Sequence, residues 1–338
     1  MLINLISDTV TKPSQAMRNA MANAEVGDDV FKEDPTINRL QDKLANMFGK
    51  EAGLFCPSGT MTNQIALKVH TNPLDEVICD YTSHIYQYET AGYAFNSGIG
   101  VNLLQGTYGK ITPDLLQKAI KGEYDWLPIS KLVVLENSTN KGGGNYYNIT
   151  EIEDIRKVCI QNNLSLHLDG ARLFNVLVET GESTQEVGAQ FDTISICLSK
   201  GLGAPVGSVL LGPADFINQA RRFRKVMGGG MRQAGIIAEA GIYALDHNVD
   251  RLKQDNDRAK TIGQLLETLP YVLSVNPVKT NILIFTLKDQ MASDFVDQLK
   301  SKHIMASAFG EKQVRFVTHL DFTEEMLEVL LMKLKELA

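Results

Sequence analysis

The sequence predicts an α/β protein, with a large domain built on a mostly parallel, doubly wound sheet and a small C-terminal α+β domain. Short apolar runs without alternation recur between residues 52 and 211, which indicates strands buried on both faces. Helical segments with one apolar face separate these runs, and strand–helix alternation is typical of a parallel sheet. Near residue 250 the pattern changes to a long charged helix and shorter strands. We therefore expect two domains, residues 1–250 and 251–338.

The elements follow in order along the chain. An irregular N-terminal arm contains one helix, which Pro13 and Ser14 begin. A second helix is expected at roughly 36–49, where Ile37, Leu40 and Leu44 have helical spacing. Strands are expected at residues 52–56, 76–80, 132–136, 164–169, 193–198 and 206–211, and in the small domain at 281–286 and 314–318. The main helices between the large-domain strands are expected at 61–70, 113–121 and 152–161.

The charge and the cysteines exclude several classes of function. The chain has 33 Lys and Arg against 40 Asp and Glu, and this net charge of −7 argues against broad binding to nucleic acid or an anionic membrane. No stretch approaches the roughly 18 apolar residues of a membrane span, and the first residues do not resemble a signal peptide. The 4 cysteines lie far apart without a CxxC pair. This pattern favours reduced thiols in a cytoplasmic protein and no metal site.

Three strand ends carry residues that suit one ligand. Ser58, Gly59 and Thr60 follow a strand and open a helix, whose free amide groups suit a phosphate, although the same turn serves as an ordinary helix cap. Asp169 ends an apolar strand and needs a cationic or donor partner, such as a protonated pyridine nitrogen or a salt-bridge residue. Lys200 follows another apolar strand, where partial desolvation favours the neutral amine needed to form an imine. A lysine at a loop edge is the alternative.

Two further features belong to the same pattern. His84 follows the strand at 76–80 and suits either stacking on a ring or a capping or core position. A basic run that includes Lys225 precedes three glycines and Arg232, which indicates either a solvated face or a close approach of backbone to a ligand. The carboxyl ends of parallel strands form one ligand-binding edge. A phosphate turn, a ring-stacking residue, an acid and a lysine along that edge together indicate pyridoxal 5′-phosphate (PLP).

The chain resembles the threonine aldolase family over nearly its whole length. That family belongs to the beta-eliminating lyases among the fold type I PLP-dependent, transferase-like enzymes, so the resemblance implies this fold and this cofactor. The segments that carry it are Ser7-Asp8-Thr9-Val10-Thr11, Val26-Gly27-Asp28-Asp29-Val30, Pro57-Ser58-Gly59-Thr60, His84, His167-Leu168-Asp169-Gly170-Ala171-Arg172, Cys197-Leu198-Ser199-Lys200-Gly201-Leu202-Gly203, Gly228-Gly229-Gly230-Met231-Arg232-Gln233 and Val317-Thr318-His319-Leu320.

The resemblance also implies roles for individual residues. Lys200 would carry PLP as a Schiff base, Asp169 would bind the pyridine nitrogen, and His84 would lie against the ring. The phosphate would be held by Ser58, Gly59, Thr60 and Arg232, with Lys225 reaching it from a neighbouring subunit. The substrate carboxylate would be bound by Ser7, Arg172 and Arg315. A homotetramer is implied, as a dimer of dimers with shared active sites.

Two departures from the family pattern affect the expected chemistry. Ile6 stands where the family usually has an arginine, and Thr139 stands where many members have a histidine near the substrate hydroxyl. A threonine hydroxyl has no accessible base form near neutral pH. We therefore expect Thr139 to position the substrate hydroxyl or a water, and His84 or an ordered water to take the proton.

The expected function is PLP-dependent retro-aldol cleavage of L-threonine and L-allo-threonine to glycine and acetaldehyde. The cofactor residues alone leave other reactions of a small amino acid open, namely β-elimination, transamination and racemisation. A rival from a different class is a non-catalytic protein that binds a phosphate or a nucleotide on the same sheet.

Overall fold

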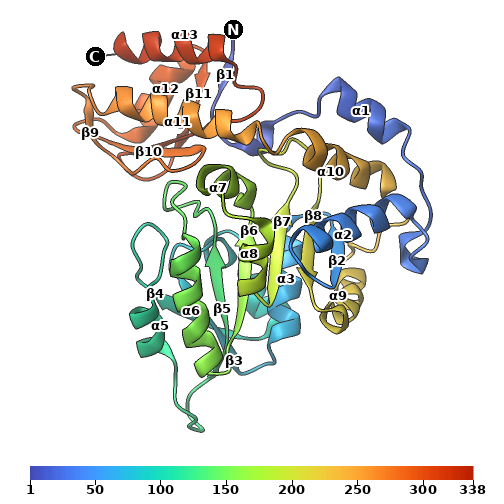
Figure 1. The fold of residues 1–338 in the computed structure, drawn as a ribbon. Coiled ribbons are helices and arrows are strands. Elements are labelled where there is room, and N and C mark those ends of the chain that lie inside the picture. The colour runs from blue at the N-terminus through green and yellow to red at the C-terminus, as the bar shows by residue number, and fades with distance from the viewer. Residues whose placement is uncertain (338) are drawn as a thin grey trace.

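The large domain of the computed structural model, which describes residues 1–337, is built on a seven-stranded sheet (Figure 1). Its strand order is β2-β8-β7-β6-β5-β3-β4, and every neighbouring pair is parallel except the two that include β8. The strands are β2 (Ala52–Cys56), β3 (Asp75–Asp80), β4 (Gly100–Leu104), β5 (Ile129–Glu136), β6 (Ser165–Gly170), β7 (Thr193–Cys197) and β8 (Ser208–Gly212). The expected mostly parallel sheet is confirmed.

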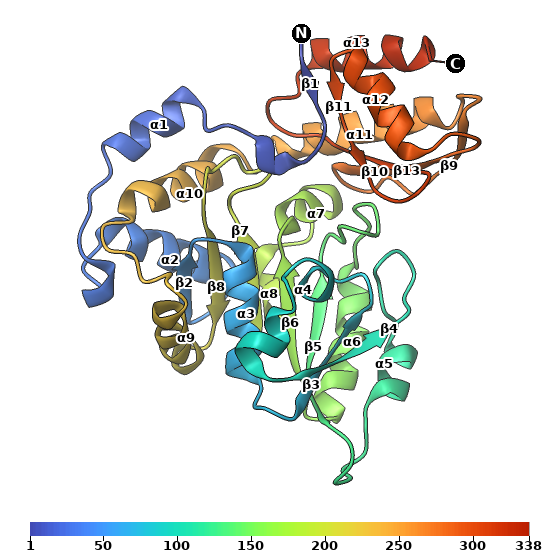
Figure 2. The same cartoon turned by 180° about the vertical axis from the view of Figure 1, so that it is seen from behind.

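Helices cover both faces of this sheet, as the two opposite views show (Figures 1 and 2). The strands β3, β7 and β8 are buried along their whole length, as expected for strands covered on both faces. The helices of the large domain are α1 (Gln15–Ala22), α2 (Pro35–Met47), α3 (Gly59–His70), α4 (His84–Gln87), α5 (Pro113–Ala119), α6 (Ile149–Gln161), α7 (Leu173–Thr180), α8 (Thr184–Gln190), α9 (Ala214–Val226) and α10 (Gly235–His247).

The small domain has its own sheet and its own hydrophobic core. Four antiparallel strands have the order β12-β13-β10-β9. They are β9 (Val272–Val275), β10 (Ile282–Leu287), β12 (Ser307–Ala308) and β13 (Gln313–Val317), and they pack with α11 (Leu252–Leu266), α12 (Ala292–Ser301) and α13 (Glu324–Lys335). None of the helices in residues 1–337 is long and apolar enough to cross a membrane.

The N-terminal arm joins the small domain, a pairing that the sequence did not indicate. Strand β1 (Ile3–Asn4) pairs in parallel with β11 (Ile304–Met305). Ile3 and Leu5 are fully buried in the hydrophobic core of the small domain. The domain boundary at residue 250 stays a prediction, and the N-terminal arm packs with the small domain although it belongs to residues 1–250.

The carboxylate of Asp8 links this arm to both domains. Asp8 is 0% exposed and accepts hydrogen bonds of 2.7 Å from Nε and Nη2 of Arg172, which follows β6 in the large domain. It also accepts one of 3.1 Å from Nδ2 of Asn281, which precedes β10 in the small domain. One buried carboxylate therefore holds three parts of the chain together.

The same contacts control the ionisation of Asp8. Burial by itself would raise the pKa of Asp8, but the charge and hydrogen bonds of Arg172, with the charge of Lys200, lower it from 3.8 to about 2. Because the folded-state pKa is below the ordinary value, this carboxylate stabilises the folded state fully above pH 3.8. The contribution is lost as the pH falls toward about 2.

We predict that Asp8→Asn lowers the free energy of unfolding by about 3–5 kcal/mol at neutral pH, because it leaves the buried charge of Arg172 without a partner. The difference from the wild type should shrink as the pH falls from 3.8 to about 2. Urea unfolding followed by circular dichroism over this range measures both effects. The control is Asp154→Asn, which removes an exposed ion pair with Lys157 and should change little. Equal effects of the two substitutions would contradict the prediction.

Candidate active site

Two adjoining cavities lie where the carboxyl ends of the central parallel strands meet. The inner cavity has a volume of about 120 Å³ and the outer one about 300 Å³, and both are lined by His84, Ala171 and Lys200. The other residues of the inner cavity are Gly59, Thr60, Asn63, Asp169, Cys197 and Ser199. The other residues of the outer cavity are Ser7, Thr9, Tyr88, Glu136, Asn140, Arg172, Phe309 and Arg315.

The N-terminus of α3 forms one side of the inner cavity. Ser58 caps this helix, because its Oγ accepts a hydrogen bond of 3.2 Å from the backbone N–H of Met61. Gly59 and Thr60 line the cavity directly. A Cβ atom on Gly59 would come within 2.5 Å of the Sγ of Cys197, so glycine is required for this close packing. The turn that the sequence predicted for phosphate therefore lies at the cavity.

Asp169 is a buried carboxylate without a charged partner in the protein. It is 3% exposed, and its Oδ2 accepts a hydrogen bond of 2.9 Å from Nδ2 of Asn63. Its Oδ1 accepts one of 3.2 Å from the N–H of Ala171. No lysine, arginine or histidine of residues 1–337 forms an ion pair with it. A buried charge of this kind calls for a cationic group on a ligand.

His84 begins α4 and is oriented by a carboxylate that the sequence did not indicate. Its Nδ1 lies 2.9 Å from Oε1 of Glu89, which also accepts a 2.9 Å hydrogen bond from Asn63. The Oε2 of Glu89 accepts a bond of 2.6 Å from Gln64. Burial by itself would lower the pKa of His84, but the bond to Glu89 and the negative charge of Asp169 raise it. Asn63 thus joins His84 and Asp169 into one buried network.

The outer cavity brings together the three residues predicted to bind a carboxylate. Asp8 holds Arg172 through Nε and Nη2, which leaves Nη1 available. Arg315 donates hydrogen bonds of 2.8 Å to Oδ1 of Asn140 and 3.0 Å to the carbonyl of Ile6. Burial, with the charge of Arg172, lowers the pKa of Arg315 to about 10, so it stays positive at neutral pH. With the hydroxyl of Ser7, two guanidinium groups line one small cavity, an arrangement suited to a carboxylate.

Thr139 is not among the residues that line either cavity. It is 1% exposed, and its hydroxyl faces the backbone carbonyls of Tyr108, at 2.9 Å, and Asn145, at 3.1 Å. The structure therefore gives its hydroxyl backbone partners outside the cavities, and its contact with substrate stays a prediction. Glu136 and Asn140, on either side of it in the sequence, face the outer cavity instead.

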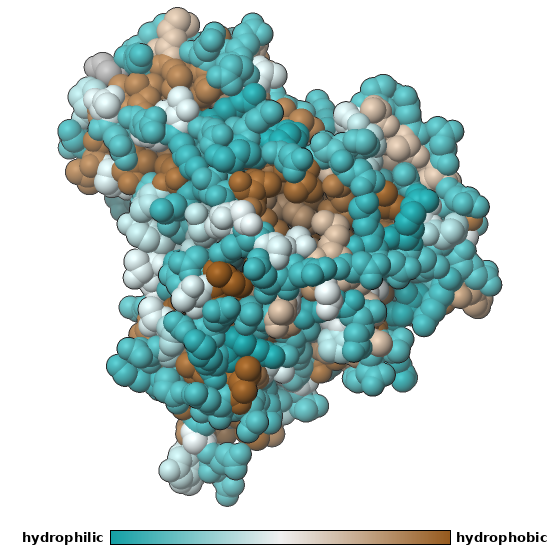
Figure 3. Space-filling view, viewed as in Figure 1, coloured by the Kyte–Doolittle hydropathy of each residue, from teal (hydrophilic) through white to brown (hydrophobic). Residues whose placement is uncertain are grey.

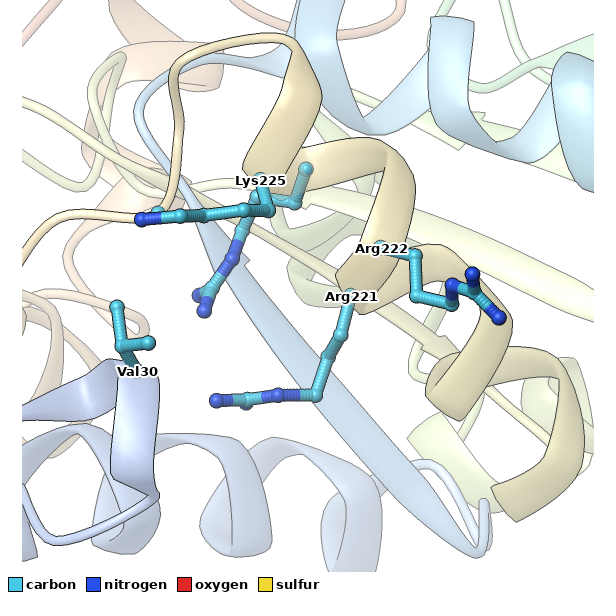
Figure 4. Close-up of a pocket in the computed structure, with 6 residues that line it drawn as sticks. Val30, Arg221, Arg222 and Lys225 are labelled. Carbon is cyan, nitrogen blue, oxygen red and sulfur yellow. The ribbon is translucent and has the colours of Figure 1, made fainter.

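Lys225 and Arg232 lie apart from the inner cavity of their own chain. Lys225 lines a separate cavity of about 380 Å³ between η2 (Asp29–Phe31) and α9, together with Arg221 and Arg222 (Figure 4). Arg232 forms an ion pair of 2.9 Å with Asp28. One chain therefore does not bring these two predicted phosphate ligands to the phosphate turn.

Comparison with known proteins identifies the family. The model of the beta-eliminating lyase family matches residues 4–290. The low specificity L-threonine aldolase of Escherichia coli (strain K12) is 40% identical over 327 residues, which cover 96% of this chain and 96% of that protein. The low-specificity L-threonine aldolase 1 of Arabidopsis thaliana is 36% identical over 329 residues, 95% of this chain and 92% of that protein.

Solved structures agree on the fold. The threonine aldolase of Leishmania major has a TM-score of 0.85 at 22% identity and covers 99% of both chains. The serine palmitoyltransferase of Sphingomonas wittichii has a TM-score of 0.77 at 17% identity, over 99% of this chain and 86% of that one. These TM-scores show that both proteins share the overall fold of this chain. This chain belongs to the threonine aldolase group of the beta-eliminating lyase family.

Proposed function

We propose that this protein cleaves L-threonine and L-allo-threonine to glycine and acetaldehyde, with PLP as its cofactor. One observation carries the proposal. Lys200, Asp169 and His84 surround a cavity that joins a second cavity holding two arginines. The first cavity suits the cofactor, and the second suits the carboxylate of an amino acid. The relatives named for this reaction support the same conclusion.

The residues of the inner cavity fit the chemical groups of PLP. Its phosphate would lie at the N-terminus of α3, where Ser58, Gly59 and Thr60 offer amide and hydroxyl donors. Its ring nitrogen would take a proton beside Asp169, the buried carboxylate that lacks a cation in the protein. The amine of Lys200 would hold its aldehyde carbon, and His84 would lie against its ring.

The protein's own contribution is charge and orientation. When bound, PLP supplies an electrophilic carbon and a conjugated ring that accepts the electron pair released at Cα. Asp169 keeps a proton on the ring nitrogen. Ser7, Arg172 and Arg315 would hold the substrate carboxylate and so fix the orientation of the bonds at Cα. Orienting the Cα–Cβ bond for cleavage in this way would be the main effect of the protein.

We also propose a cytoplasmic homotetramer, a dimer of dimers in which subunits share active sites. Lys225 and Arg232 would then reach the phosphate of a neighbouring subunit, which accounts for their distance from the cavity of their own chain. Apolar surface adjoins this basic region, because Phe31 and Val226 are 68% and 79% exposed. The face in Figure 3 is mostly hydrophilic, with hydrophobic atoms gathered near its centre. The 4 cysteines, all buried and unpaired, suit a reducing compartment.

Product analysis tests the proposed reaction. Purified protein supplied with PLP should release acetaldehyde and an equal amount of glycine from both L-threonine and L-allo-threonine. A 2-oxo acid as the main product would indicate elimination or transamination, and a change of configuration alone would indicate racemisation. Any of these three results, or no reaction, would overturn the proposal.

We predict that Lys200→Ala loses the visible absorbance of bound PLP and nearly all turnover, since this amine is the one that borders both cavities. Borohydride reduction followed by mass spectrometry should attach the cofactor to Lys200 in the wild type and to no residue in the variant. The control is Lys253→Ala, on the exposed side of α11, which should keep both properties. A cofactor trapped on another lysine in the wild type would refute the assignment.

We predict that Asp169→Asn binds PLP more weakly and slows cleavage by about 10- to 100-fold, because a neutral amide does not hold a proton on the ring nitrogen. A charge-assisted hydrogen bond contributes about 1.5–3 kcal/mol, and 1.36 kcal/mol corresponds to a factor of ten in rate. Titration of the apoprotein with PLP and steady-state kinetics measure the two effects. Unchanged kinetics would show that Asp169 only caps its strand.

A further inference from the structure

Glu136 is a second carboxylate in the outer cavity, and the reaction scheme above assigns it no role. It ends β5 and is 6% exposed. Its Oε2 accepts a hydrogen bond of 3.0 Å from the backbone N–H of His84, and its Oε1 accepts one of 2.7 Å from the N–H of Asn140. Within residues 1–337 it forms no ion pair. Each oxygen keeps a lone pair for a further partner, and the cavity wall is where that partner would be.

The surroundings of Glu136 favour proton exchange near neutral pH. Burial and the negative charge of Asp169, its neighbour across the β5–β6 pair, raise the pKa of Glu136 to about 7. The N–H groups of Asn140 and His84 act in the opposite direction and support the anion. The charge of His84 lowers the pKa of Glu136 as well, and Glu136 in turn contributes to the raised pKa of Arg172. A general base is most effective when its pKa is close to the working pH.

Other cavity groups are less suited to take a proton from a substrate hydroxyl. His84 is bonded to Glu89 through Nδ1, and its raised pKa favours the imidazolium form, which has no free lone pair. Thr139, at the position where the family often has a histidine, faces two backbone carbonyls outside the cavity. Glu136 is the carboxylate of the outer cavity, and its basic lone pairs lie beside His84 and the carboxylate-binding arginines.

We propose that Glu136 is the catalytic base that removes the β-hydroxyl proton, an inference that rests on the proposed function. A carboxylate oxygen of Glu136 takes the proton, and the electron pair of the O–H bond becomes the second bond of the aldehyde carbonyl. The Cα–Cβ bond breaks at the same time, and its electron pair stays with the glycine fragment. Glu136 is left neutral and returns to the anion when a proton passes from it, through water, to Cα of the glycine fragment, which completes glycine.

The test compares two reactions of the PLP-loaded enzyme. Cleavage of L-threonine and L-allo-threonine requires removal of a hydroxyl proton, whereas exchange of the α-proton of glycine with deuterium does not, because glycine has no hydroxyl. Glu136→Gln should lower kcat for both cleavages by about 100-fold or more. The rise of activity with pH through about 7 should disappear, because activity requires the ionised carboxylate. Glycine exchange and the Kd of glycine, measured by calorimetry, should stay within about threefold of the wild type.

The matched control is Glu76→Gln. Glu76 is also a buried glutamate, 1% exposed and bonded to Asn102 and Ser130. It differs in forming an ion pair with Lys121, and it lies near the start of β3, away from both cavities. This variant should keep the wild-type cleavage rate and pH profile. If Glu136→Gln does not fold, Glu136→Asp replaces it. The shortened carboxylate should cleave at least about tenfold more slowly and keep the rise with pH.

Each contrary result has a distinct meaning. Cleavage by Glu136→Gln within tenfold of the wild type, with the rise through pH 7 retained, would overturn the role of Glu136 and leave the proposed function intact. An equal loss of cleavage and glycine exchange would show a structural role and overturn the proposal in the same way. A wild-type protein that releases no acetaldehyde would overturn the proposed function itself, and the role of Glu136 with it.

Discussion

Two hydrogen bonds of 2.7 Å join the buried carboxylate of Asp8 to the guanidinium group of Arg172, and the rest of the site is arranged around them. Asp8 is fully buried and Arg172 is 7% exposed, so each charge depends largely on the other to remain ionised. The pair fixes the N-terminal arm against the end of β6, and the bond from Asn281 adds the small domain. The pair also leaves Nη1 of Arg172, which lines the outer cavity, available for a further partner. The position of one arginine thus depends on contacts from three segments far apart in the sequence.

A second constraint comes from the register of the sheet. Strands β5 and β6 pair so that Glu136 lies beside Asp169, and both carboxylates are buried at the same edge. Two adjacent acids do not ionise independently in such a place. Asp169 has Asn63 and the N–H of Ala171, whereas Glu136 has two backbone N–H groups and no cation. One pair of neighbouring residues in a parallel sheet therefore provides two buried carboxyl groups with different hydrogen-bond partners.

Features that depend on local sequence patterns could be predicted from the sequence, whereas features that depend on tertiary contacts could not. The strands near residues 52–56 and 76–80 were predictable because their apolar runs are local, whereas β4 was missed because Gly100 and Asn102 interrupt its apolar pattern. Lys200 and Asp169 were predictable as polar groups at strand ends. Glu89 was not, because it follows a short helix and reaches His84 only through the fold. The position of Thr139 depends on hydrogen bonds to the carbonyls of Tyr108 and Asn145. These contacts form only in the folded chain, so the sequence pattern did not predict them.

The pairing of β1 with β11 has a mechanical consequence. Ser7 follows Leu5, which is buried in the core of the small domain, and Arg315 on β13 is bonded to the carbonyl of Ile6. Ser7 and Arg315 are thereby held by the small domain, whereas Lys200 belongs to the large domain. Any tilt of the small domain carries Ser7 and Arg315 together toward the lysine or away from it. The width of the outer cavity therefore depends on how the small domain lies against the large one, and the carboxylate of Asp8 is bonded to both.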